Sequence, residues 1–245
     1  MKTTGNTVLI TGGSTGIGFS LAQAFSETGN NVIICDRREA KLQEAKAKIP
    51  KLETTICDVS NPRSRQALFD WTTSNFRDLN ILVNNAGIQR QIDFNKGTLD
   101  LLDGENEITV NIEAPIQLSA LFMPHLLKKQ ESAIVNVTSG LAFTPLAIVP
   151  VYCATKAALH SFTLSLRHQL SDTSIKVFEV APPIVDTELD KGAREERQQD
   201  DRGIAPEEVA KETLQGLRDD QFEIVIGIAN NLRQHPEEMF EVINR

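Results

Sequence analysis

Short apolar runs alternate with longer stretches of helical periodicity along nearly the whole chain. The apolar runs are rich in Val and Ile and predict strands, whereas the stretches between them predict helices. We expect strands at 6–11, 32–36, 52–58, 80–84, 132–139, 175–182 and 222–227. We expect helices at 16–28, 39–48, 62–76, 98–129 and 152–170, with a further helix beginning at Pro206.

This alternation is typical of an α/β fold in which helices cover both faces of a parallel sheet. We therefore predict one Rossmann-type domain with a doubly wound sheet, spanning residues 1–245. The polar stretch 187–205 has the length and polarity of a lid over a binding site. Ligands of such sheets bind beyond the carboxyl ends of the strands, so the chemistry should lie there.

Composition narrows the class of partner. The net charge is −8 and no dense cluster of Lys and Arg occurs, so neither nucleic acid nor an anionic membrane is an expected partner. No apolar run reaches the ~18 residues of a membrane span, and the N-terminus lacks the core of a signal peptide. Three scattered cysteines fit a reducing cytoplasm, where we expect the protein. The histidines lack ligand spacing, so we expect no metal.

The sequence TGGSTGIG, residues 11–18, directly follows the first expected strand. Gly12 would permit a tight turn, Gly16 a close approach of the backbone to a phosphate, and Gly18 close packing of helix on strand. The helix that follows would offer unpaired N–H groups to a pyrophosphate. In isolation this could be an ordinary glycine-rich turn, but its place between the first strand and the first helix favours dinucleotide binding.

Asp36 ends the second expected strand, where an acid accepts hydrogen bonds from the adenosine ribose of a dinucleotide. Arg37 and Arg38 follow and could hold the 2′-phosphate of NADP. A carboxylate about 4 Å from that phosphate would repel it by several kcal/mol at an effective dielectric constant near 20. We therefore expect NAD as the cofactor and keep NADP as an alternative.

Tyr152 is the only tyrosine of the chain, and a helix would place it on one face with Lys156. A phenol with a pKa near 10 is a weak acid or base at neutral pH. Lowering that pKa by about three units takes about 4 kcal/mol, which an ammonium about 4 Å away supplies at a dielectric constant near 20. The pair could therefore act as an acid/base, although a core tyrosine beside a solvated lysine would have the same spacing.

Other small or polar residues stand near the ends of the central strands. Ser139 ends the fifth expected strand, and NNAG, residues 84–87, ends the fourth. Asn111 falls within an expected helix, where asparagine is unfavourable. Pro115 lacks the N–H that would bond the carbonyl of Asn111. We expect a kink at this point and a carbonyl that is able to hold a water molecule.

Together, TGGSTGIG, NNAG, Asn111, Ser139 and Tyr152-x-x-x-Lys156 resemble the short-chain dehydrogenase/reductase family over nearly the whole chain. PVYCATKAALHS and APPIVDT resemble its D-alanine-transfer-operon branch. The resemblance implies a homodimer or homotetramer that transfers a hydride between a nicotinamide cofactor and a small carbonyl or alcohol substrate. A non-catalytic NAD(P)-binding redox sensor of the same fold is the alternative.

The resemblance also implies roles for single residues. Tyr152 would pass a proton to or from the substrate oxygen, and Lys156 would contact the nicotinamide ribose and lower the pKa of Tyr152. Ser139 would position the substrate oxygen, and Asn111 would hold a water next to Lys156. The other residues implied to contact the cofactor are Gly12, Ser14, Gly16, Ile17, Gly18, Asp36, Arg37, Asp58, Val59, Asn85, Ala86, Gly87, Pro182, Val185 and Thr187.

The chain departs from the family pattern at two positions. It has Pro182-Pro183 where the family usually has Pro-Gly, and Asp36-Arg37 where the branch often has the Gly-Arg linked to NADP. Side chains that flank the expected site could contact the substrate, or several of them could belong to the core. They are the apolar Leu141, Ala142, Phe143, Leu146 and Ile184 and the polar Gln89 and Arg90.

Overall fold

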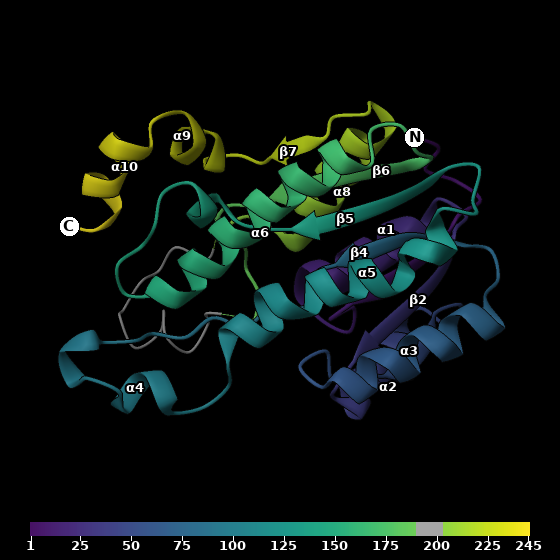
Figure 1. The fold of residues 1–245 in the computed structure, drawn as a ribbon, viewed down its shortest axis with the longest axis horizontal. Helices are drawn as coiled ribbons and strands as arrows, with labels where there is room; N and C mark the ends of the chain where they lie inside the picture. Colours follow the sequence, from purple (N-terminus) through teal and green to yellow (C-terminus); the bar gives the residue numbers. More distant parts are fainter. Residues whose placement is uncertain (190–202) are drawn as a thin grey trace.

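Seven parallel strands form one sheet among residues 1–189 and 203–245, the residues that this computed structural model describes (Figure 1). The strands are β1 (Thr7–Thr11), β2 (Asn31–Asp36), β3 (Glu53–Ile56), β4 (Leu79–Asn84), β5 (Ser132–Val137), β6 (Ile175–Ala181) and β7 (Glu223–Val225). Their order across the sheet is β3-β2-β1-β4-β5-β6-β7. The predicted fold class is therefore confirmed.

The chain changes its direction of travel across the sheet between β1 and β4. It runs from β1 through β2 to β3 on one side, then returns to place β4 against the other edge of β1. At such a switch point the connections leave the two central strands in opposite directions and open a crevice beyond their carboxyl ends.

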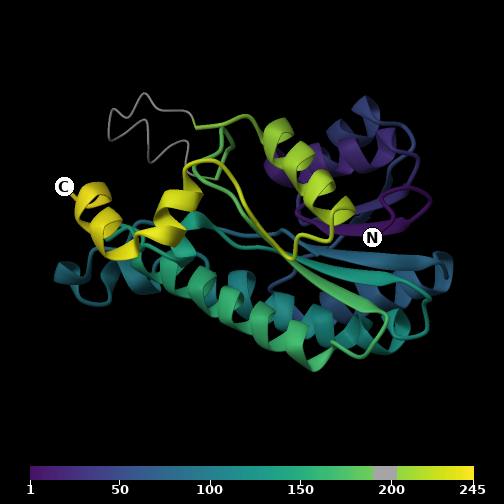
Figure 2. The ribbon, with the colours of Figure 1, turned by 90° about the horizontal axis from the view of Figure 1, so that it is seen from above.

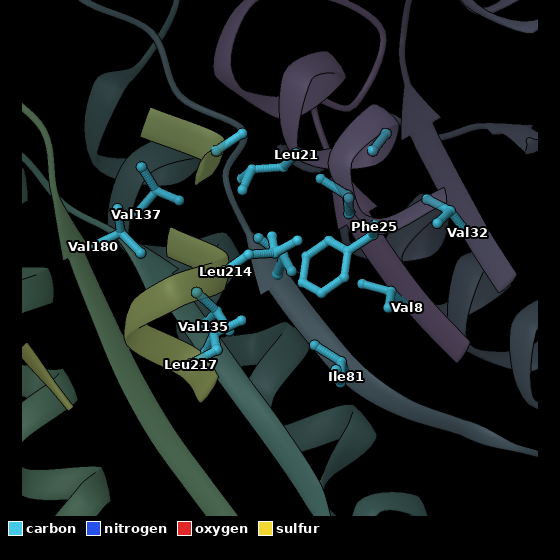
Figure 3. Packing of buried hydrophobic residues seen from close by; sticks show 14 of the residues in the cluster. Val8, Leu21, Phe25, Val32, Ile81, Val135, Val137, Val180, Leu214 and Leu217 are labelled. Atoms are coloured by element: carbon cyan, nitrogen blue, oxygen red, sulfur yellow. The ribbon is translucent and has the colours of Figure 1, made fainter. Parts of the chain in front are cut away.

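Helices cover both faces of the sheet (Figure 2). On one face lie α1 (Gly16–Glu27), α2 (Glu39–Lys48) and α8 (Pro206–Arg218), and on the other lie α3 (Pro62–Asn75), α5 (Ala114–Leu126) and α6 (Pro150–Gln169). Figure 3 shows Phe25 of α1 and Leu217 of α8 packed against strand residues such as Val8 and Val135. Because both faces are covered, the strands carry almost continuous apolar runs.

Local sequence sets where several helices begin. The side chain of Asn61 accepts hydrogen bonds from the backbone N–H groups of Arg63 and Ser64 at the start of α3. Pro62, Pro150 and Pro206 occupy the first turns of α3, α6 and α8, where proline's missing N–H costs no helical hydrogen bond.

The predicted helix at 98–129 was wrong as one continuous element. A short helix, α4 (Leu99–Leu102), ends before Gly104, which has a φ of +80°. The Oδ1 of Asn106 then accepts a hydrogen bond of 2.9 Å from Ile108 N and starts a new helical segment. The periodicity of apolar residues concealed a glycine and an asparagine that favour a break.

The new segment passes through a π-helical turn, η2 (Thr109–Glu113), before α5 begins at Ala114. Asn111 lies within this turn, and Pro115 follows it. The expected distortion of the helix near Asn111 is therefore present, since single π-helical turns form where the regular hydrogen-bond pattern is interrupted.

Two C-terminal helices, α9 (Ala229–Gln234) and α10 (Pro236–Ile243), follow β7 and were not predicted. Two 3-10 turns, η1 (Phe94–Lys96) and η3 (Gly140–Ala142), complete the described elements. Most of the stretch 187–205, predicted to be a lid, lies outside the described residues. Within the described part of the chain, no helix is both long and apolar enough to span a bilayer.

Candidate active site

A cavity of about 730 Å³ lies at the carboxyl ends of the central strands, at the switch point between β1 and β4. Most of the predicted site residues line it. They are Gly12, Gly16, Ile17, Gly18, Asp36, Arg37, Asp58, Val59, Asn85, Ala86, Gly87, Ser139, Tyr152, Lys156, Pro182, Val185 and Thr187. Ser14 and Asn111 do not line it, and both are buried.

Gly12 and Gly18 of the glycine loop have no room for a side chain. Gly12 has a φ of +61°, which an L side chain rarely adopts. A Cβ added to Gly18 would lie 2.3 Å from the carbonyl oxygen of Gly12 and 2.5 Å from Nδ2 of Asn85. The same Nδ2 donates a hydrogen bond of 2.9 Å to the carbonyl oxygen of Thr11. The loop is therefore a tight backbone cradle at a helix N-terminus, which fits the pyrophosphate of a dinucleotide.

Asp36 lies at one end of the cavity with its carboxylate held by neighbours. Ser14 Oγ donates to Oδ2 at 2.5 Å, and the backbone N–H of Arg38 donates to Oδ1 at 2.9 Å. Burial raises the pKa of Asp36, but hydrogen bonds from Arg38 and Ser14 outweigh it and leave the pKa below its ordinary value. The carboxylate is therefore ionised at neutral pH. Ser14 thus holds Asp36 in place rather than facing the cavity.

The two arginines after Asp36 are both engaged in ion pairs. Arg37 pairs with Glu105 from the loop after α4. Arg38 pairs with Asp36 at 3.2 Å and with Glu188 at 3.3 Å. These contacts connect the end of β2 to segments on either side of the cavity.

Tyr152 and Lys156 lie on one face of α6, and both are nearly buried, at 5% and 4% exposed. The Nζ of Lys156 donates a hydrogen bond of 2.9 Å to the carbonyl oxygen of Val137 and lies 5.6 Å from the centre of the Tyr152 ring. Burial lowers the pKa of Lys156 to about 8, because desolvation disfavours the charged amine. At pH 7 this lysine therefore places an ammonium beside the phenol.

Ser139 follows β5 and begins the turn η3. Its Oγ accepts a hydrogen bond of 3.1 Å from the backbone N–H of Leu141. That bond fixes the side chain at the edge of the same cavity as Tyr152. A serine hydroxyl can still donate a hydrogen bond while it accepts one.

Asn111 lies outside the cavity and forms hydrogen bonds to segments that line it. Its Oδ1 accepts a hydrogen bond of 2.9 Å from Ile88 N, and its Nδ2 donates to Ile88 O at 2.8 Å and to Thr155 Oγ1 at 3.1 Å. The side chain thus joins the π-helical turn to the segment after β4 and to α6. The expectation that its backbone carbonyl holds a water stays a prediction.

The expected substrate residues divide into two groups. Leu141, Leu146, Ile184, Gln89 and Arg90 line the cavity, whereas Ala142 and Phe143 do not. The sequence analysis missed four apolar residues that also line it, from α9, α10 and the segment before them. These are Ile228, Leu232, Met239 and Ile243. The four-residue spacing of Met239 and Ile243, which places them on one face of α10, is a signal that could have identified this part of the wall.

One group of potential metal ligands is present among the described residues. His160, Glu179 and Glu223 place ligand atoms within 4.8 Å of one another. The ring of His160 lies 2.8 Å from Glu179 Oε2, and Arg233 Nε donates to Glu223 at 2.8 Å. These contacts within the protein account for the cluster, and the absence of a metal stays a prediction.

Comparison with known proteins supports the fold and its class. Residues 6–198 match the sequence model of the short chain dehydrogenase family. The chain is 54% identical over 248 residues to the uncharacterized oxidoreductase DltE of Bacillus subtilis, covering 100% of this chain and 98% of that protein. It is 31% identical over 226 residues to an NADP-dependent 3-hydroxy acid dehydrogenase of Schizosaccharomyces pombe, covering 87% of each.

A solved structure has the same fold. The short-chain dehydrogenase/reductase of Burkholderia phymatum in complex with NAD superposes with a TM-score of 0.86 at 22% identity, covering 100% of this chain and 97% of that one. Together, the family model and the full-length likeness to DltE show that this chain belongs to the short-chain dehydrogenase/reductase family of nicotinamide-dependent oxidoreductases.

Proposed function

We propose that this enzyme reduces an aldehyde or ketone, or oxidises the corresponding alcohol, with Tyr152 as the acid/base. The observation that carries the proposal is the pairing of Tyr152 with the buried Lys156 in a cavity that Ser139 also lines. A nicotinamide cofactor bound in this cavity would supply or accept the hydride. The residues of the chain bind the cofactor and the substrate, orient them and move the proton.

In the direction of reduction, the hydroxyl of Tyr152 gives its proton to the carbonyl oxygen as that oxygen becomes an alcohol. The phenolate that remains is stabilised by the ammonium of Lys156, since an adjacent opposite charge favours the ionised form. Ser139 donates its hydroxyl proton in a hydrogen bond to the same substrate oxygen and orients it. In the direction of oxidation, the phenolate removes the proton instead.

A Tyr152→Phe variant tests this role, because it removes the proton donor and keeps the ring. We expect kcat/KM for a panel of aldehydes and ketones to fall by about 10²–10⁴-fold, the usual contribution of a positioned acid/base. Cofactor affinity, measured by fluorescence titration, should stay within about threefold of wild type. Turnover at the wild-type rate would show that Tyr152 is not the acid.

We further propose NAD as the preferred cofactor. The fixed and ionised carboxylate of Asp36 can accept hydrogen bonds from the ribose hydroxyls of NAD and would repel the 2′-phosphate of NADP. Arg37 and Arg38, which could hold that phosphate, already pair with acids. The named cofactors of the relatives include both forms, so titration of NADH and NADPH side by side is the test. Binding of NADPH at least tenfold tighter would contradict this preference.

We also propose a homodimer or homotetramer that pairs through α5 and α6. Ile116 on α5 and Leu164 on α6 are apolar and remain 38% and 42% exposed. Burial of such side chains is typical of interfaces between identical subunits. Light scattering should give a mass of two or four chains, and a monomer at micromolar concentration would contradict the proposal.

A further inference from the structure

Part of the cavity wall next to Tyr152 is made of aliphatic side chains. Tyr152 belongs to a small buried cluster with Val149 and Cys153, and Leu141 and Leu146 pack against that cluster. Leu141 and Leu146 also line the cavity. A substrate whose oxygen reaches Tyr152 therefore lies beside an apolar surface.

The C-terminal helices extend this apolar wall. Leu232 of α9 and Met239 and Ile243 of α10 line the same cavity. A Cβ added to Gly140, the residue after Ser139, would lie 2.9 Å from Leu232 Cδ1. Helix α9 thus packs directly on η3, and both C-terminal helices lie at the end of the sheet where α6 begins (Figures 1 and 2).

Hydrogen bonds fix α9 and α10 to the loop that leads into α6. Thr144 Oγ1 donates to the carbonyl oxygen of Leu232 at 2.8 Å. The side chain of Asn244 accepts from Ala147 N at 2.6 Å and donates to Pro145 O at 3.1 Å. These hydrogen bonds therefore hold both α9 and the end of α10 in place, as a preformed binding surface requires.

Each basic side chain of the cavity already has an ion-pair or hydrogen-bond partner within the protein. Among residues 1–189 and 203–245, the cavity is lined by four basic residues. Arg37 and Arg38 pair with acids at the β2 end. Both terminal nitrogens of Arg90 donate to backbone carbonyls, of Glu105 at 2.7 Å and of Asp100. Lys156 is the remaining one, and it is the buried partner of Tyr152.

We propose that the substrate is an uncharged carbonyl compound, or its alcohol, with an aliphatic or arylalkyl tail that packs against α9 and α10. This inference rests on the proposed role of Tyr152 in carbonyl chemistry. An apolar tail gains from burial against Leu232, Met239 and Ile243. A carboxylate at the same place would lose its hydration without gaining a cationic partner from the described residues.

A matched pair of aldehydes tests the inference, because hexanal and 6-oxohexanoate differ only at the far end of the chain. We expect kcat/KM for hexanal to exceed that for 6-oxohexanoate by at least tenfold. From butanal to octanal, kcat/KM should rise about fourfold per methylene, the value of one buried methylene group. An equal or higher kcat/KM for 6-oxohexanoate would overturn the inference and leave the carbonyl chemistry intact.

Binding of inert amides separates the pocket from the chemistry. Calorimetry should show that hexanamide binds at least tenfold more tightly than 5-carbamoylpentanoate, whether or not turnover occurs. If neither aldehyde were reduced with either cofactor but this preference held, the proposed function would fail and the apolar pocket would stand. If the two amides bound equally, the apolar pocket would be disproved.

Two variants of α10 locate the tail. Met239→Arg places a cation in the cavity wall and should improve the ratio of kcat/KM for 6-oxohexanoate over hexanal by at least tenfold. Val242→Arg adds the same charge on the same helix at a position that is 51% exposed and outside the cavity. It should leave the ratio within about twofold of wild type. Equal ratios in the two variants would show that α10 does not contact the substrate.

Discussion

At the β2 end of the cavity, Asp36, Arg37 and Arg38 pair with neighbouring polar groups, and their contacts extend to the protein surface. At the α6 end, Lys156 is buried beside Tyr152 and aliphatic side chains, and its amine donates a hydrogen bond to a backbone carbonyl. The first arrangement compensates each charge locally, whereas the second leaves a charge partly uncompensated. This difference indicates that the β2 end serves recognition and the α6 end serves chemistry.

Replacing Lys156, whose charge is partly uncompensated, should give the largest effect on activity. In Lys156→Met the phenolate of Tyr152 loses its cationic neighbour, so we expect kcat at pH 7 to fall by about 10²–10⁴-fold, as for loss of an acid/base partner. Lys211→Met, which removes an exposed lysine of α8, should keep kcat within about twofold. An unchanged kcat in Lys156→Met would remove the chemical distinction between the two ends.

The same variant should be more stable than wild type at neutral pH. The pKa of Lys156 is about 8 in the folded chain, against an ordinary value of 10.5, so burying the charge costs about 3 kcal/mol below pH 8. Between about pH 8 and 10.5 the unfolded chain binds more protons, so wild-type stability should rise with pH and the advantage of the variant should shrink. Thermal melts should show a gain of about 6 °C at pH 7. A gain that grew with pH would contradict this account.

At the β2 end, the largest effect should come from the backbone rather than from a charge. Gly18→Ala would place a Cβ 2.3 Å from Gly12 O, so the glycine loop must move away from the position where it receives the pyrophosphate. We expect NADH affinity to fall at least 100-fold and the free energy of unfolding to drop by about 1–3 kcal/mol. Fluorescence titration and urea denaturation measure the two effects.

Gly29→Ala is the matched control for Gly18→Ala. Gly29 has a φ of +80°, and a Cβ there would contact nothing within 4 Å. It should cost about 1 kcal/mol of backbone strain and leave NADH affinity unchanged. Similar NADH affinities in the two variants would show that the glycine loop does not bind the cofactor.

The two ends also differ in how far the sequence predicts them. TGGSTGIG and Asp36 at the β2 end, and Tyr152 with Lys156, are local patterns with fixed spacing, and the structure brings them to one cavity. The apolar wall from α9 and α10 could not be predicted in the same way. It depends on tertiary packing of Leu232 on Gly140, about 90 residues earlier in the chain.

The fold shows the same division. Apolar runs predicted every strand of the sheet, because buried parallel strands need them on both faces. The stretch 98–129 was predicted wrongly, because its apolar periodicity continues across the break at Gly104. The partners of Ser14 and Asn111 were also beyond prediction, since hydrogen bonds to Asp36 and Ile88 depend on segments that meet only in the folded chain.

A smaller effect should follow from removing the charge of Asp36 while keeping its shape. In Asp36→Asn the electrostatic repulsion of a 2′-phosphate disappears, so the ratio of NADPH affinity to NADH affinity should rise at least tenfold. Glu39→Gln removes an exposed acid at the start of α2 that does not line the cavity, and it should change the ratio by less than about twofold. An unchanged ratio in Asp36→Asn would mean that the charge of Asp36 has no role in cofactor choice.

The smallest effect should come from Arg37, whose ion pair with Glu105 joins side chains that are 48% and 44% exposed. Exposed pairs contribute about 0–1 kcal/mol, so Arg37→Gln and Glu105→Gln should each lower the free energy of unfolding by less than about 1 kcal/mol. The decrease should be smaller still at high salt. If the pair only connects the two segments, both variants should bind NADPH alike. If Arg37 instead held a 2′-phosphate, Arg37→Gln alone would weaken NADPH binding by tenfold or more while NADH binding stayed constant. That outcome would show that the charge of Arg37 is available to a ligand and is not fully compensated by Glu105. The β2 end would then resemble the α6 end, where the charge of Lys156 is partly uncompensated.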